Sequence, residues 1–305
     1  MSDSVVPDRG ATGRGLKRIA MMTGAYGTRN FTVKDIIDGK GRRRFIQTLP
    51  FSVEEAEAAA EAGIDMMKVR FDPLAPGFAT DVRRVAPHTF LSFSMSLTTV
   101  ASEAEALRAA YAAMEIGADS IMCQWSPRFM AAVAENDVPI EGHAGLVPRK
   151  STWTGGLRAV GKTLDEAMWV YRRIKAFEEA GAWAVEIEVI PHQLMTELST
   201  RTSLVTVSIG SGPGGDVQFL FAQDILGDGA PPFPRHSKQY ADLYAMRNEM
   251  QAARVDAFKA YIDEVSSGAF PGPQHLVNLD DVVLRSFREQ VDDEPFDDEP
   301  FDDEG

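Results

Sequence analysis

Apolar and polar positions along the middle of the chain repeat as one unit: an amphipathic helix rich in Ala and Glu, a short turn, and an apolar strand. Three copies are plain, over residues 52–69, 102–123 and 163–189. In each copy a glycine (Gly63, Gly117 or Gly181) falls where a helix has to end in the left-handed conformation, which a residue without a Cβ adopts cheaply. Strands that alternate with helices run parallel, so the repeat predicts a parallel sheet.

Further apolar segments supply more strands, at 45–49, 89–93, 139–140 and 204–209. At least seven strands interleaved with helices favour a closed (β/α)₈ TIM barrel, and a barrel of about 250 residues commonly forms a single domain. A doubly wound open sheet is the structural alternative. No Gly-x-Gly-x-x-Gly stands between a first strand and its helix, however, which disfavours that alternative.

The two ends of the chain differ from the middle. We expect an N-terminal extension over 1–41, the catalytic barrel over 42–288 and an acidic, disordered tail over 289–305. The extension is rich in Gly, Arg and Asp and shows little periodicity. The segment 292–304 carries nine carboxylates and no base, and blocks of like charge repel one another and stay solvated. A partner-binding role is the alternative for this tail.

Charge and composition narrow the class of protein. The net charge is −14, but without the nine carboxylates of the tail it is −5, which argues against a nucleic-acid partner. A lone cysteine, Cys123, excludes an internal disulfide and a thiolate zinc cluster. No apolar run approaches the roughly 20 residues that span a bilayer, and the N-terminus has no secretory signal pattern. These features predict a cytoplasmic protein that is stabilised by packing.

Polar side chains follow most of the predicted strands, which is where the reactive groups of such barrels lie. Any one of them could be a solvated loop residue, so it is the occurrence of several at strand ends that indicates an active site. The candidates are Asp72, Ser94, Gln124, Glu141, His143, Glu186, Glu188 and Ser208.

Glu188 stands out because it lies in a strongly apolar run, 183–191. Burial there would raise the pKa of its carboxyl group, which suits a general base near neutral pH. Glu186 lies two residues earlier and so shares a face of the strand with Glu188; two nearby carboxylates either share a proton or bind a cation. A structural ion pair with Arg or Lys is the alternative for each of them.

Several stretches resemble one enzyme family in the same order along the chain. They are VPIEGHAGLVP (138–148), TGGLRAVGK (154–162), EAGAWAVEIEVIP (179–191), VSIGSGP (207–213) and VSSGAFP (265–271). Together they resemble ketopantoate hydroxymethyltransferase, a family of the phosphoenolpyruvate mutase and isocitrate lyase superfamily. The resemblance covers about residues 44–275 and is most specific in the second half.

The resemblance implies a (β/α)₈-barrel transferase of pantothenate biosynthesis, usually a decamer. In such an enzyme Mg²⁺ chelates a 2-oxo acid, a glutamate removes the carbon-bound proton, and the enolate attacks methylenetetrahydrofolate. Glu188 falls on that glutamate. A divalent cation on the carboxylate and carbonyl oxygens would stabilise the developing enolate. The resemblance also implies substrate contacts at Ser94, Met122, His143 and Ser208.

The chain departs from the family where the metal is held. The three carboxylate ligands of the family fall near Asp72, on Ser94 and on Gln124, and Met122 stands in place of a substrate-binding lysine. Asp72, a serine and an amide would bind Mg²⁺ weakly without further oxygen ligands. Glu141 and Glu186 are hypothetical replacements. Alternatively the enzyme has dispensed with the metal and acts on another carbonyl substrate.

Two other functions remain open at this point. One is a carbon–carbon lyase or aldolase of the wider superfamily, which would act on a different 2-oxo acid and would not need a folate. The other is a catalytically silent barrel that acts as a scaffold through its acidic tail. The loop 153–158 is a plausible lid, although its Trp153 could equally pack against a neighbouring subunit.

Overall fold

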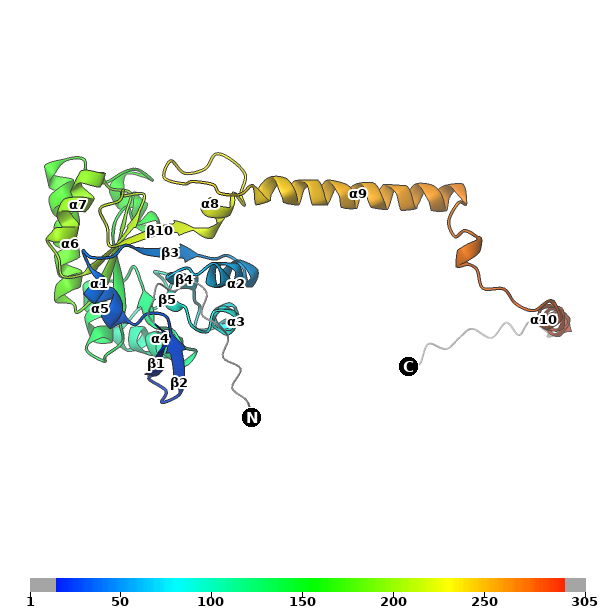
Figure 1. Cartoon of the computed structure of the whole chain (residues 1–305), viewed down its shortest axis with the longest axis horizontal. Coiled ribbons are helices and arrows are strands. Elements are labelled where there is room, and N and C mark those ends of the chain that lie inside the picture. Colours follow the sequence, from blue (N-terminus) through cyan, green and yellow to red (C-terminus); the bar gives the residue numbers. More distant parts are fainter. Residues whose placement is uncertain (1–14, 294–305) are drawn as a thin grey trace. The chain divides into compact units, whose positions relative to one another are not determined.

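Eight parallel strands close into a barrel in the order β10-β3-β4-β5-β6-β7-β8-β9 in the computed structural model, which describes residues 15–293 (Figure 1). The strands are β3 (Phe45–Leu49), β4 (Met66–Arg70), β5 (Phe90–Ser94), β6 (Ser120–Met122), β7 (Ile140–Gly145), β8 (Ala184–Glu188), β9 (Val205–Ile209) and β10 (Val217–Phe221). The predicted (β/α)₈ barrel is therefore confirmed.

Helices connect the strands and surround the barrel (Figure 1). They are α2 (Val53–Glu61), α3 (Gly77–Val85), α4 (Glu103–Glu115), α5 (Pro127–Ala134), α6 (Leu164–Glu179), α7 (His192–Thr200) and α8 (Ala222–Leu226), with a 3₁₀ helix, η1 (Pro148–Thr154), after β7. The three glycines that end the repeated helices have φ of 82°, 95° and 80°, as the sequence predicts. At the N-terminal end of each of these helices, a side-chain hydroxyl accepts a hydrogen bond from a backbone N–H, which stabilises the first turn. The capping residues are Ser52, Ser102 and Thr163.

The eighth strand, β10, is an element that the sequence pattern does not predict. No helix separates it from β9, because the chain returns through the short glycine-rich segment 210–216. The Asp216 carboxylate secures this return by accepting hydrogen bonds from the backbone N–H and hydroxyl of Thr206 and from the Lys40 ammonium. A pattern based on helix, turn and strand cannot find a strand that lacks its helix.

The described part of the N-terminal extension closes one end of the barrel. It forms an antiparallel pair, β1 (Lys17–Ala20) and β2 (Tyr26–Arg29), and the helix α1 (Val33–Gly39). Ile36 of α1 packs into the apolar cluster that includes Phe45, and the Arg29 guanidinium donates to Asp119 at 2.7 Å just before β6. The extension therefore covers the amino ends of the strands and leaves their carboxyl ends open.

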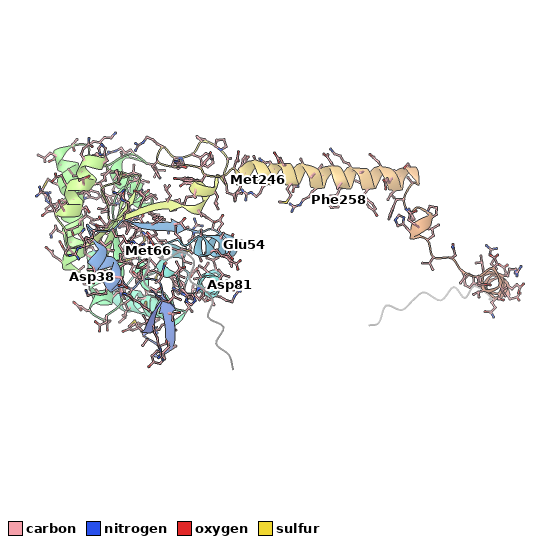
Figure 2. All side chains as sticks on the ribbon, in the orientation of Figure 1. Asp38, Glu54, Met66, Asp81, Met246 and Phe258 are labelled. Atoms are coloured by element: carbon pink, nitrogen blue, oxygen red, sulfur yellow. The ribbon has the colours of Figure 1, made fainter. Side chains whose placement is uncertain are left out.

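The chain beyond Tyr244 forms a separate compact unit. It contains nearly all of α9 (Leu243–Ser267), the 3₁₀ helix η2 (Pro273–His275) and α10 (Asp281–Asp293). Neither α9 nor α10 buries a residue; on α9, Met246 and Phe258 are 60% and 69% exposed (Figure 2).

These bounds differ from those expected from the sequence. The barrel unit ends before 288, and residues 289–293 belong to α10. Val283, Phe287 and Val291 recur at the four-residue spacing of an amphipathic helix, which carries the helix into the acidic segment. Residues 294–305, most of the predicted tail, lie outside the described residues, as do residues 1–14 of the extension. Over 15–293, no helix is long and apolar enough to cross a membrane.

Candidate active site

A buried ion-pair network occupies the middle of the barrel. The Lys68 ammonium, on β4, donates to the carboxylates of Glu141 on β7 (2.8 Å) and Glu186 on β8. All three side chains are at most 5% exposed, and the Ser92 hydroxyl also donates to Glu141. Both carboxylates considered as replacement metal ligands thus share one ammonium partner, Lys68, which no local sequence pattern predicts.

Burial and charge act in opposite directions on these carboxyl groups. Burial raises the pKa of Glu141 despite the nearby Lys68 ammonium. Burial also opposes ionisation of Glu186, but the charges of Lys68 and His143 outweigh it and hold the pKa of Glu186 below its usual range. The two pKa shifts thus have opposite directions, and the ionised form is favoured for Glu186.

Glu188 and His143 meet one layer higher, at the carboxyl ends of β8 and β7. The His143 Nε2 atom lies 3.0 Å from Glu188 Oε2 and 3.4 Å from Glu186 Oε1. Burial lowers the pKa of the His143 imidazole, but the two carboxylates outweigh it and the net shift is upward. An imidazole whose protonated form is favoured by two carboxylates thus faces Glu188, whose side chain is 15% exposed.

Gln124 follows β6 and contacts the other side of the same imidazole. Its Nε2 atom lies 3.3 Å from His143 Nδ1, whereas its buried Oε1 atom has no hydrogen-bond partner. Rotating the amide by 180° would turn Oε1 toward Nδ1–H, from which it could accept a hydrogen bond. Gln124 therefore fixes the orientation of His143, as polar neighbours of functional histidines commonly do.

The other predicted site residues make different contacts. The exposed Asp72 accepts a hydrogen bond from the backbone N–H of Leu74. The Ser94 hydroxyl faces the Met122 sulfur at 3.6 Å. Ser208 points out of the barrel and donates to the carbonyl of Gly212. Asp72 and Ser208 consequently do not converge with Glu188.

The donor groups do not fit the magnesium site that the resemblance implies. Within residues 15–293, His143, Glu186 and Glu188 offer ligand atoms within 4.8 Å of one another and could hold a metal ion. Magnesium prefers an all-oxygen set, however, whereas this group includes an imidazole nitrogen, and Glu186 already accepts from Lys68. Glu188 also cannot serve as a metal ligand and as a free base in one step.

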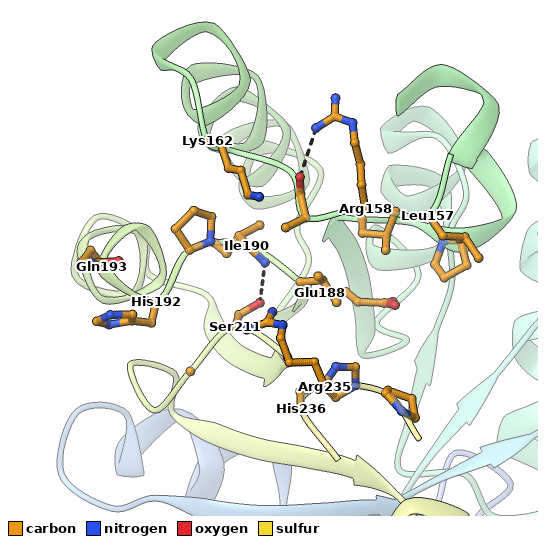
Figure 3. A pocket seen from close by; sticks show the side chains of 18 of the residues that line it. Leu157, Arg158, Lys162, Glu188, Ile190, His192, Gln193, Ser211, Arg235 and His236 are labelled. Atoms are coloured by element: carbon orange, nitrogen blue, oxygen red, sulfur yellow. Dashed lines mark hydrogen bonds between the residues drawn. The ribbon is translucent and has the colours of Figure 1, made fainter. Parts of the chain in front are cut away.

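The cavities beside the Glu188–His143 pair include a larger and a smaller one. Glu188 lines the larger one, of about 1210 Å³, and Figure 3 shows Lys162, Arg235 and His236 around the space beside it. His143 lines the smaller one, of about 210 Å³. The other residues of the smaller cavity are Gly145, Val147, Lys150, Trp153, Thr154, Trp169 and Arg173.

A closed parallel barrel whose strand ends bring a carboxylate, an imidazole and two cavities together defines an enzyme of the (β/α)₈-barrel class. The model of the family described as ketopantoate hydroxymethyltransferase matches residues 67–273. The chain belongs to this family.

Relatives agree with this assignment, and a solved structure agrees with the fold. The chain is 31% identical to the 3-methyl-2-oxobutanoate hydroxymethyltransferase of Kosmotoga olearia, over 80% of this chain and 96% of that protein. It is also 31% identical to an enzyme of the same name from Thermus thermophilus, over 80% of this chain and 98% of that protein. A Burkholderia cenocepacia structure described as a "putative phosphonomutase" superposes with a TM-score of 0.50 at 12% identity, over 74% of this chain and all of that one. That likeness shows the fold alone.

Proposed function

We propose that this protein transfers a hydroxymethyl group from methylenetetrahydrofolate to 3-methyl-2-oxobutanoate, with Glu188 as the base. Family membership supports the reaction class. The observation that carries the proposal is the position of Glu188, which lies at the carboxyl end of β8, 3.0 Å from His143 and beside the larger cavity. We further propose that the enzyme acts in the cytoplasm, and that it forms a homo-oligomer, as the family resemblance implies.

The reaction begins with proton removal. The Glu188 carboxylate takes the proton from C3 of the 2-oxo acid, and the C–H electron pair moves to form the enolate. The positive charge of His143 lies beside the position where the negative charge develops, which lowers the barrier. Water cleaves both C–N bonds of the methylene unit, which leaves an N–H on each folate nitrogen and the one-carbon unit as formaldehyde. The enolate carbon then bonds to the formaldehyde carbon, and the oxygen takes the proton back from Glu188 to become the hydroxyl group.

The larger cavity suits the bulky donor. Its volume of about 1210 Å³ exceeds the roughly 300–1,000 Å³ of typical small-ligand pockets. Lys162 and Arg235 line it, and neither forms an ion pair within residues 15–293. A folate carries carboxylates on its glutamate end, so these cations would attract that end of the donor.

Turnover tests the proposed reaction. Ketopantoate should form from 3-methyl-2-oxobutanoate and methylenetetrahydrofolate, and formation should continue in the presence of EDTA because residues 15–293 bring together no all-oxygen set of magnesium ligands. If ketopantoate forms only when Mg²⁺ is present, the expectation that the reaction is independent of metal is wrong. Release of an aldehyde from a hydroxylated 2-oxo acid without folate would favour the lyase, and no turnover with any 2-oxo acid would favour the scaffold.

Magnesium titration tests the alternative in which Glu141 is a replacement ligand. We expect wild type and Glu141→Gln to give the same calorimetric signal with Mg²⁺, because Lys68 and Ser92 already engage that carboxylate. Glu57→Gln, at an exposed position of α2, is the matched control. Magnesium binding that is lost in Glu141→Gln and kept in the control would show that the metal site has moved.

A further inference from the structure

The smaller cavity contains two cations that have no acidic partner. Lys150, on η1, donates from Nζ to the carbonyl oxygen of Gln124, and Arg173, on α6, donates to the carbonyl oxygen of Trp125 at 3.5 Å. Over residues 15–293, neither cation forms an ion pair with a carboxylate. Both side chains are half-buried and line one cavity, so two positive charges share it.

This arrangement is unfavourable without a ligand. Burial lowers the pKa of Lys150, and the charge of Arg173 lowers it further; burial also lowers the pKa of Arg173. Partly buried charges need a partner of opposite sign to recover their lost hydration. An anion between the two side chains would supply that partner.

The walls of the cavity indicate the size and shape of the anion. The indoles of Trp153 and Trp169, 89% and 45% exposed, provide apolar surface beside the two cations, and His143 reaches the same space. The volume of about 210 Å³ is below the roughly 300–1,000 Å³ of pockets for drug-sized ligands. Only a small anion with a short apolar part therefore fits.

We propose that Lys150 and Arg173 bind the carboxylate of the small 2-oxo acid and so hold the substrate where the family uses a metal. A guanidinium can donate two parallel hydrogen bonds to a carboxylate, and an ammonium adds a third. The rest of the substrate then lies toward His143, whose Nε2 is 3.0 Å from Glu188. The identity of the acid in this inference rests on the proposed function, whereas the binding of a carboxylate by Lys150 and Arg173 does not.

Calorimetric binding of 3-methyl-2-oxobutanoate, without donor so that no turnover occurs, tests the subsite. Lys150→Met and Arg173→Met should each weaken binding by about tenfold to a hundredfold, the range for a hydrogen bond between charged groups. Lys34→Met, at an exposed position of α1, should bind the acid as wild type does. Arg173→Lys, which keeps the charge, should lose less than Arg173→Met. Circular dichroism checks that each variant is folded.

A second arm needs only the wild-type protein. The methyl ester of the same 2-oxo acid has no negative charge and should bind at least tenfold more weakly than the acid. An ester that binds as tightly as the acid would overturn the proposal, as would folded Lys150→Met and Arg173→Met variants with wild-type affinity.

The outcomes separate this subsite from the proposed function. If wild type fails to bind the 2-oxo acid but binds isobutyrate in a manner that depends on Lys150 and Arg173, the carboxylate subsite stands and the proposed substrate fails. If the protein binds the 2-oxo acid independently of both residues, the subsite fails and the proposed function stands. If no carboxylate binds to wild type, the subsite is refuted.

Discussion

Replacing Glu188 by Gln is expected to lower kcat for ketopantoate formation by about 10²–10⁴-fold, the contribution of a well-placed general base. The amide keeps the size and shape of the side chain but cannot accept the proton from C3. Glu188 is partly exposed and does not belong to the Lys68 network, so the fold should be retained. Steady-state kinetics measures the loss.

A carboxylate on the neighbouring helix provides the control for this variant. Glu197 of α7 is 62% exposed and pairs with Arg201, so Glu197→Gln should leave kcat unchanged. An unchanged kcat in Glu188→Gln would remove Glu188 from the chemistry. A raised KM with unchanged kcat would instead assign it to ground-state binding.

Replacing Lys68 by Met should destabilise the fold by about 3–5 kcal/mol, because breaking a buried ion pair leaves its partners uncompensated. Here two carboxylates, Glu141 and Glu186, would lose their ammonium at once. The free energy of unfolding in urea measures the effect.

An exposed lysine gives the matched comparison. Lys34 forms a surface pair with Asp38 on α1, at 78% and 56% exposure, and Lys34→Met should cost less than about 1 kcal/mol. Adding Glu141→Gln and Glu186→Gln to Lys68→Met should recover part of the lost stability, because neutral amides remove the uncompensated charge. A loss below about 1 kcal/mol in Lys68→Met would contradict the network.

Local patterns in the sequence are sufficient to predict most of the barrel and part of its site. The helix, turn and strand repeat predicts three of the eight barrel strands, at residues that follow helices ending at Gly63, Gly117 and Gly181, and four further apolar segments predict four more. Alternation along β7 and β8 places Glu141, His143, Glu186 and Glu188 on the inner face. The structure brings all four together in the barrel.

Long-range contacts are what the sequence pattern cannot predict. Lys68 lies 73 residues from Glu141 along the chain, and its strand reads as an apolar segment with one lysine. Lys150 and Arg173 come from a 3₁₀ helix and a long α-helix, whose charged residues are typical of solvated surfaces. Only the packing of the loops after β6 and β7 brings these cations into one cavity.

Proton exchange at C3 of 3-methyl-2-oxobutanoate in D₂O tests the role of Glu188 most directly, since it requires neither the donor nor the later steps. NMR follows the replacement of the C3 proton by deuterium. The wild-type protein should catalyse this exchange, and Glu188→Gln should reduce it to the uncatalysed rate while Glu197→Gln does not. Exchange that continues at the wild-type rate in Glu188→Gln would show that another group is the base.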